Sequence, residues 1–175
     1  MTRITRSKTP VIRDYYLNNE KLKVVSETPY LGIHLQNDLK RNRHVDCVSG
    51  KASRTLGMIK RNLRMNNIKL KTTAYKTLVR PTMEYGATAW DAYTKKNINK
   101  LEGAQRSAAH YILRNYERKS GTVTRLLDQL QLESLADRRK QLRLTLLFKI
   151  VNNLVDIPRD HLLTQHSKEQ EEATV

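Results

Sequence analysis

The feature that most constrains this chain is a stretch beginning near residue 42 in which apolar residues recur at steps of three and four. The recurring positions are Val45, Val48, Ala52, Leu56, Ile59 and Leu63. Such spacing predicts a helix of about twenty residues with one buried face. At roughly 100° per residue, the opposite face collects cations and small residues. They are Arg43, Cys47, Arg54 and Arg61, flanked by Lys51, Gly50 and Gly57.

The cationic face of this helix has two interpretations. Basic residues form the solvated face of many helices, which needs no ligand. Asp46, however, is the single acid in the stretch, so intrahelical ion pairs explain few of the cations. Gly50 and Gly57 each cost roughly 1 kcal/mol in a helix interior. They are tolerated either for the close approach of a ligand or for tight packing against another helix.

The net charge favours a polyanionic partner. The chain has 33 Lys and Arg against 17 Asp and Glu, a formal charge of +16 and a pI near 10.1. Such a balance indicates nucleic acid before an acidic protein surface. Residues 1–80 carry most of the excess, so we expect nucleic-acid contact mainly in the first half.

Length and composition predict one domain with a thin core, since the chain has 175 residues of which 38% are hydrophobic. Cys47 is the only cysteine, which excludes an intramolecular disulfide, and the scattered histidines do not suggest a zinc site. The first residues lack the apolar run of a signal peptide, and no stretch is long enough to span a bilayer. We expect a soluble intracellular chain, in the nucleus or cytoplasm, with no membrane contact.

Short strands are expected before the first helix. Residues 12–17 and 21–25 have strand-like composition, and the turn between them at 18–20 predicts a hairpin. Pro29 blocks ladder pairing, and residues 30–35 after it form another strand, in which Gly32 permits close backbone approach. Three short strands cannot bury a core alone, so they must lean on the helices.

Further helices are predicted at residues 69–79, 97–113 and 122–130, and from a capping-box variant at Ser134 to residue 153. Pro81 either kinks the helix before it or opens a short one through Tyr85. Trp90 is expected in the core rather than stacked on a base. In the last helix, leucines 135, 142 and 146 point inward. The cluster at residues 138–143 is expected to be a charged outer face, with phosphate contact as the alternative.

Signatures of catalysis are missing from the sequence. Phosphodiester chemistry needs carboxylates that converge on divalent metal, and the one adjacent acidic pair, Glu171 and Glu172, lies in the polar tail. No Walker-type lysine loop or dinucleotide glycine motif occurs, and Cys47 is expected to be an inert thiol rather than a nucleophile. We therefore expect neither an enzyme nor a cofactor; a compact basic nuclease ranks last.

Five strings, in order and spacing, resemble one family: TRITRSKTPV, YLGIHLQNDLKRNRHV, KASRTLGMIKRNL, AYKTLVRPTMEYGATAW and KLEGAQRSAAHYIL. They are similar to the segment C-terminal to the catalytic palm in LINE-type, jockey-like non-LTR retrotransposon reverse transcriptases. The resemblance covers residues 3–163. It implies a thumb that grips the primer and template duplex, followed by a helical extension, while the family's polymerase aspartates and endonuclease lie upstream and match no residue here.

The resemblance implies a mostly α, α+β fold: a small N-terminal antiparallel hairpin and strand cluster, a thumb-like helical bundle, and C-terminal helices. The expected boundaries are 1–36 for the palm edge, 37–116 for the thumb, 117–163 for the extension and 164–175 for a disordered tail. The expected contacts with an RNA/DNA duplex, or with RNA, are to phosphates. They involve Arg43, Lys51, Arg54 and Arg61, then Arg64, Lys69 and Lys71.

The chain also departs from the family pattern. Arg41 stands where relatives have Trp, Ala92 stands where they have Pro, and residues 63–71 replace a linker that often contains Cys-Pro. Together with a start inside a palm-edge strand, this predicts a truncated reverse-transcriptase fragment that an upstream palm or fingers segment would complete. The alternatives are an inert mobile-element relic and a helical protein-interaction module.

Overall fold

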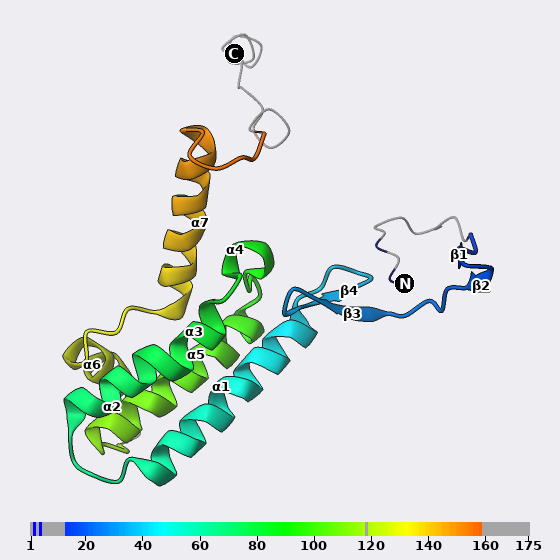
Figure 1. Ribbon diagram of the computed structural model, residues 1–175. Coiled ribbons are helices and arrows are strands. Elements are labelled where there is room, and N and C mark those ends of the chain that lie inside the picture. Colours follow the sequence, from blue (N-terminus) through cyan, green and yellow to red (C-terminus); the bar gives the residue numbers. More distant parts are fainter. Residues whose placement is uncertain (1, 3, 5–12, 118, 159–175) are drawn as a thin grey trace, which may run out of the picture.

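The computed structural model describes residues 2, 4, 13–117 and 119–158, and its elements form a helical bundle with two small hairpins at one end (Figure 1). In order they are β1 (Tyr16–Leu17), β2 (Glu20–Lys21), β3 (Glu27–Tyr30), β4 (Ile33–Gln36), α1 (Asn42–Asn62), α2 (Ile68–Ala74), η1 (Tyr75–Val79), α3 (Arg80–Glu84), α4 (Ala87–Trp90), α5 (Lys95–Leu113), α6 (Thr122–Gln129) and α7 (Leu135–Val151). The expected mostly helical α+β class is confirmed.

The first hairpin is smaller than the sequence suggests. Its antiparallel strands β1 and β2 have two residues each, in place of the predicted 12–17 and 21–25. The turn lies at the predicted position, because Asn18 and Asn19 adopt φ of 48° and 62° and asparagine tolerates this left-handed region. Residue 12 and the predicted tail, 164–175, lie outside the described residues.

The strand predicted at 30–35 is correct for residues 33–35, which lie in β4, but it is interrupted at residues 31 and 32 by the turn of a second hairpin. Leu31 and Gly32 have φ of 47° and 79° and connect β3 to β4. Pro29 therefore lies inside a strand, opposite His34. In a two-residue hairpin this second pair is a non-hydrogen-bonded one, so Pro29 needs no N–H there. The His34 N–H likewise points away from the ribbon, and it donates to Nδ1 of His44 on α1 at 3.2 Å.

The helix predicted at 69–79 continues to residue 84, with a π-helical turn, η1, in its middle. Proline has no N–H and its ring collides with the carbonyl four residues earlier, so the turn before Pro81 widens. The Arg80 N–H accordingly donates to the carbonyl of Tyr75, five residues back. Pro81 thus stands in the first turn of α3, the second of the two predicted alternatives.

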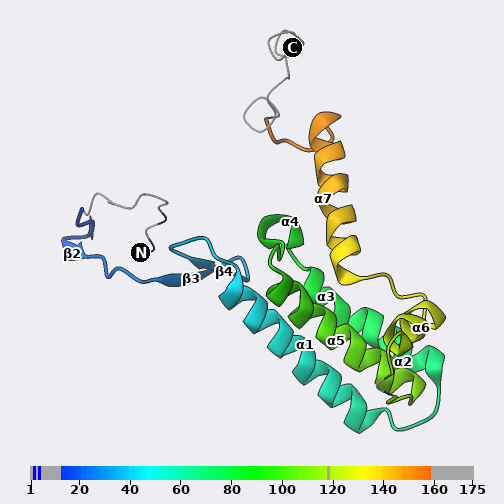
Figure 2. The ribbon, with the colours of Figure 1, turned by 180° about the vertical axis from the view of Figure 1, so that it is seen from behind.

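The core lies between α1, η1 to α3 and α5, and α1 and α5 run side by side in both views (Figures 1 and 2). Trp90 is fully buried, as predicted; its Nε1 donates to the Tyr85 carbonyl at 2.6 Å and its ring meets that of His44 edge-on. Leu126 and Leu135, beyond the expected boundary at 116/117, belong to the same hydrophobic cluster as the bundle. The core is therefore continuous across that boundary.

The basic cluster of α7 is only in part the charged outer face expected from the sequence. Lys140 is exposed as expected, whereas the first two arginines fasten α7 to the bundle. Arg139 is buried and its Nε donates to Asp91 at 2.9 Å, while Arg138 pairs with Glu84 through both ends of its guanidinium. Removing one partner of such a buried pair strands a charge, so these acids are structural. Beyond the cluster α7 projects from the bundle, and Leu142 is exposed rather than inward (Figure 1).

We expect His44 to make the fold sensitive to acid. Burial, with help from the positive charges of His34 and Arg41, lowers the pKa of His44 from 6.5 to about 4. The unfolded chain takes up this proton near pH 6.5 and the folded chain near 4. Stability is thus full above pH 6.5 and falls by up to about 3 kcal/mol as the pH drops to 4.

Urea unfolding at a series of pH values checks this expectation, with His44→Gln as the comparison. Between pH 4 and 6.5, the free energy of unfolding of the variant should depend less steeply on pH, by the slope that corresponds to uptake of one proton. Equal slopes in the two proteins would contradict the assignment to His44.

Candidate nucleic-acid interface

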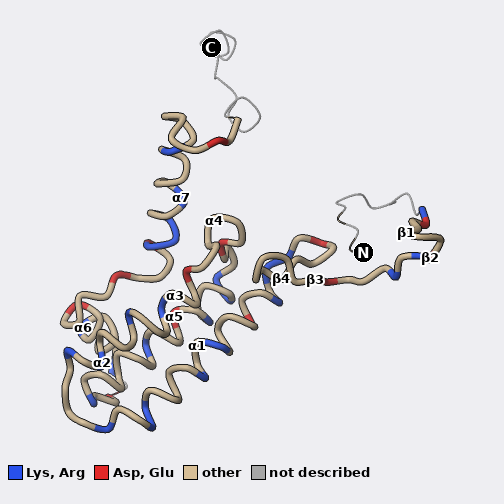
Figure 3. Tube along the Cα trace, viewed as in Figure 1, with Lys and Arg blue, Asp and Glu red and all other residues tan. Residues whose placement is uncertain are grey.

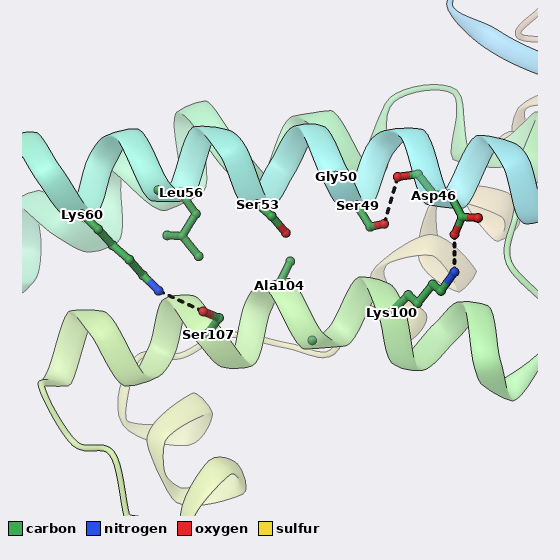
Figure 4. Close-up of a pocket in the computed structure, with 11 residues that line it drawn as sticks. Asp46, Ser49, Gly50, Ser53, Leu56, Lys60, Lys100, Ala104 and Ser107 are labelled. Atoms are coloured by element: carbon green, nitrogen blue, oxygen red, sulfur yellow. Dashed lines mark hydrogen bonds and ion pairs between the residues drawn. The ribbon is translucent and has the colours of Figure 1, made fainter.

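A polar groove runs between α1 and α5, with a volume of about 410 Å³ (Figure 4). Its floor is formed by small and hydroxyl-bearing residues because the apolar stripe of α1 turns beneath it into the core. The lining includes Ser49, Gly50, Ser53 and Gly57 from α1 and Gly103, Ala104 and Ser107 from α5. At one end Lys100 pairs with Asp46, and at the other the Lys60 Nζ donates to Ser107 Oγ at 3.0 Å. We call this feature the α1–α5 groove.

Two of the predicted contact residues, Arg54 and Arg61, do not line the α1–α5 groove but lie beside two glycines that do, a position we call its rim. A guanidinium nitrogen of each lies 3.5 Å from where a Cβ would stand on Gly50 and Gly57 respectively. Both side chains are exposed, and neither has a carboxylate partner in the described part of the chain. Their spacing of seven residues corresponds to about 10 Å along the helix. In the described part of the chain, the rim therefore presents two cations that no acid compensates.

The same geometry decides between the two explanations for the glycines. A methyl group on Gly50 or Gly57 would meet only the flexible end of an arginine, at ordinary contact distance. Helix packing therefore does not require these glycines. Both glycines line the α1–α5 groove, beside the arginines.

The other predicted residues of α1 lie elsewhere. The Arg43 Nε donates to Glu27 Oε1 at 3.3 Å, so Arg43 joins α1 to β3 while half of its side chain remains exposed, and phosphate contact there stays a prediction. Lys51 is exposed but lines a second hollow, of about 600 Å³, together with His34, His44 and Cys47. The single ridge predicted from the helical spacing is thus divided. Figure 3 shows the blue positions spread along α1 and α2 rather than gathered at one point.

The second tier of predicted residues divides as well. Lys69 is exposed in the first turn of α2, and Arg64 is exposed just after α1, where its Nε donates to the Arg61 carbonyl at 3.2 Å. Lys71 is 1% exposed, so it does not belong to an exposed ridge. Its ammonium lies 4.5 Å from the centre of the Tyr111 ring. Arg64 and Lys71 instead face a separate pocket with Tyr111.

Sequence reasoning missed Lys60, Lys100 and Ser107, because two of them lie on α5 and all three acquire a role only where the helices meet. A signal existed in the alternation of small residues with hydroxyls at the helical repeat on both segments. Among the described residues, no group of three or more His, Cys, Asp or Glu side chains could hold a metal ion.

Comparison of the chain with models of protein families, with characterised proteins and with solved structures gives no match in any of the three. Within the described residues, no helix combines the length and the apolar character needed to cross a bilayer.

Replacing Gly50 and Gly57 with alanine should stabilise the protein. Alanine is preferred over glycine in a helix interior by about 1 kcal/mol, and both methyl groups fit at ordinary contact distance. Urea denaturation of the two single variants checks the expected gain of roughly 0.5–1 kcal/mol each. A decrease in stability would show that packing does require the glycines.

Proposed function

We propose that this chain is a non-catalytic, thumb-like fragment of a LINE-type reverse transcriptase, and that it contacts the phosphate backbone of an RNA/DNA duplex without reading sequence. The resemblance of five ordered strings supports the family. The observation that carries the binding function is the pair Arg54 and Arg61, exposed and without carboxylate partners in the described residues, on the rim of the α1–α5 groove.

A comparison of Arg54 and Arg61 with three arginines that have acidic partners supports this function. Arg43, Arg138 and Arg139 each have an acidic partner that compensates the charge. An arginine without such a partner retains its full set of donors for an anion, and guanidinium matches the geometry of phosphate oxygens. A cation kept free on a chain of charge +16 adds repulsion to the fold, which binding to a polyanion relieves.

The α1–α5 groove supplies neutral donors beside these cations. The hydroxyl groups of Ser53 and Ser107 and the charge of Lys60 lie within it. Backbone contacts of proteins with nucleic acid come from such arginines, lysines and serines, and they fix position without discriminating bases. The groove therefore fits a sugar-phosphate strand better than a base edge, which would need amide or carboxylate partners.

We expect Arg54→Gln combined with Arg61→Gln to weaken binding to an RNA/DNA heteroduplex. Removing one phosphate contact should reduce the magnitude of the slope of log K against log salt concentration by about 1, so the double variant should show a reduction of about 2. Fluorescence anisotropy with a labelled heteroduplex over a range of salt concentrations measures this slope.

The matched control is Lys140→Gln with Lys149→Gln, which removes the same charge from exposed positions of α7. Its slope should stay within about half a unit of the parent value, because neither lysine lies at the groove. Equal reductions in both variants would show that net charge, and not the rim of the α1–α5 groove, governs binding. Absence of any salt dependence in the parent chain would overturn the proposed function.

A second candidate function, a helical protein-interaction module, is favoured by the projecting half of α7. Leu144, Leu147 and Phe148 are exposed there, by 54%, 42% and 61%. Apolar groups gathered on one helix often mark a protein contact, here with an upstream palm or fingers segment. Sedimentation of the chain mixed with an upstream palm segment should then show a complex that Leu147→Glu with Phe148→Glu abolishes. Failure of the parent chain to form a complex at any concentration of the palm segment would exclude this candidate.

A further inference from the structure

A second cationic feature lies at the far end of the bundle, where α1 and α5 terminate. It is a pocket of about 290 Å³, roughly the share of ten water molecules in the liquid. Its charged lining consists of Lys60, Arg64, Lys71 and Arg114, and Leu63, Tyr111 and Tyr116 complete it. No acid lines it among the described residues. We call it the helix-end pocket.

Lys71 is the residue that sets this pocket apart. Only 1% of its surface is exposed, yet in the part of the chain that the structure describes it has no carboxylate partner and no hydrogen-bond acceptor. Among the described residues, the group that compensates the charge of Lys71 is the aromatic ring of Tyr111, whose centre lies 4.5 Å from the Lys71 Nζ. The Lys71 Nζ is not among the buried polar atoms of the described residues that lack a partner, so the ammonium group is open to the pocket rather than sealed in the core. A cation–π contact is weaker than a paired counter-charge. The contact with Tyr111 therefore compensates the charge only in part.

The conventional explanation accounts for Arg64 and Arg114 but not for Lys71. Helices end in carbonyls without partners, and basic side chains commonly cover them. Arg64 donates to the carbonyl of Arg61, and Arg114 donates to that of Arg64 at 2.8 Å. Tyr111 Oη closes the end of α1 by donating to the Leu63 carbonyl at 2.6 Å. Lys71 comes from α2 and, in the described part of the chain, covers no such carbonyl.

The pocket also retains the donors that an oxyanion needs. Each guanidinium has five N–H groups, of which the contacts to carbonyls use only one each on Arg64 and Arg114. Burial lowers the pKa of Lys71, and the nearby Arg114 lowers it further. An anion between them would oppose both effects.

We infer that the helix-end pocket binds a phosphate group, with Lys71 at its base and Arg64 and Arg114 at its mouth. Lys60 lines both this pocket and the α1–α5 groove, so the two features are neighbours. The phosphate is either the terminal group of a strand lying in the groove or free phosphate. In the first case the inference rests on the proposed function and extends it to recognition of a strand end.

Isothermal titration calorimetry of the full chain with inorganic phosphate, at constant ionic strength set with chloride, tests the pocket. The parent should bind phosphate and gain thermal stability in proportion to saturation. Lys71→Met keeps the unbranched shape and removes the charge, and it should lower the affinity at least tenfold. Its melting temperature without phosphate should equal or exceed that of the parent, which shows that the variant folds.

Two further variants keep the test decisive. Arg114→Gln, at an exposed position, should also weaken phosphate binding, and Lys140→Met, an exposed lysine of α7, should leave it unchanged. If the parent does not bind phosphate, or binds it equally well after Lys71→Met, the inference is overturned.

A pair of octanucleotides, one with a 5′-phosphate and one with a 5′-hydroxyl, separates the two sources. Tighter binding of the phosphorylated strand that Lys71→Met abolishes identifies the strand end, and equal binding of both strands with phosphate still bound through Lys71 identifies free phosphate. Weakened heteroduplex binding in the Arg54 and Arg61 double variant, with phosphate binding intact, tests the proposed function separately from this pocket.

Discussion

The packing of α1 against α5 is the contact on which the rest of the structure depends. It buries Val45, Ala52 and Leu56 in the same cluster as Leu101 and Ala108, and this fixes the rotation of α1 about its axis. Once that rotation is fixed, it determines which feature each of the other side chains of α1 faces. The serines and glycines face the α1–α5 groove, Arg54 and Arg61 lie on its rim, and Lys51 faces a different hollow.

Charge compensation then separates structural cations from available ones. Arg138, Arg139 and Arg143 hold α7 against Glu84 and Asp91, and Arg43 pairs with Glu27 in a hairpin, so acids within the fold compensate the charges of these arginines. Cations at the α1–α5 groove and at the helix-end pocket remain available. A low density of acids in the first half of the chain is what leaves them uncompensated.

Local pattern predicted the helices well and the strands poorly. The apolar repeat at 42–63 and the capping serine before α7 are local signals, and Ser134 Oγ indeed accepts from the Asp137 N–H at 3.0 Å. The strand predicted at 30–35 missed the turn at residues 31 and 32, because leucine at φ of 47° is disfavoured and nothing at Leu31 suggested a turn. The contact that holds this hairpin to the bundle, His34 to His44, joins side chain and backbone from separate elements and has no local signature.

The sequence by itself determined that α1 is amphipathic, that the chain is strongly basic and that Trp90 belongs in the core, because periodicity, charge and a lone large aromatic are properties of nearby residues. Only the tertiary structure decided which cations are free. Acids far away in the sequence neutralise Arg138 and Arg139, while Lys71 is buried beside Tyr111 without an acid among the residues that the structure describes. Whether a cation has an acidic partner depends on distances between helices. The spacing of residues along one helix does not predict those distances.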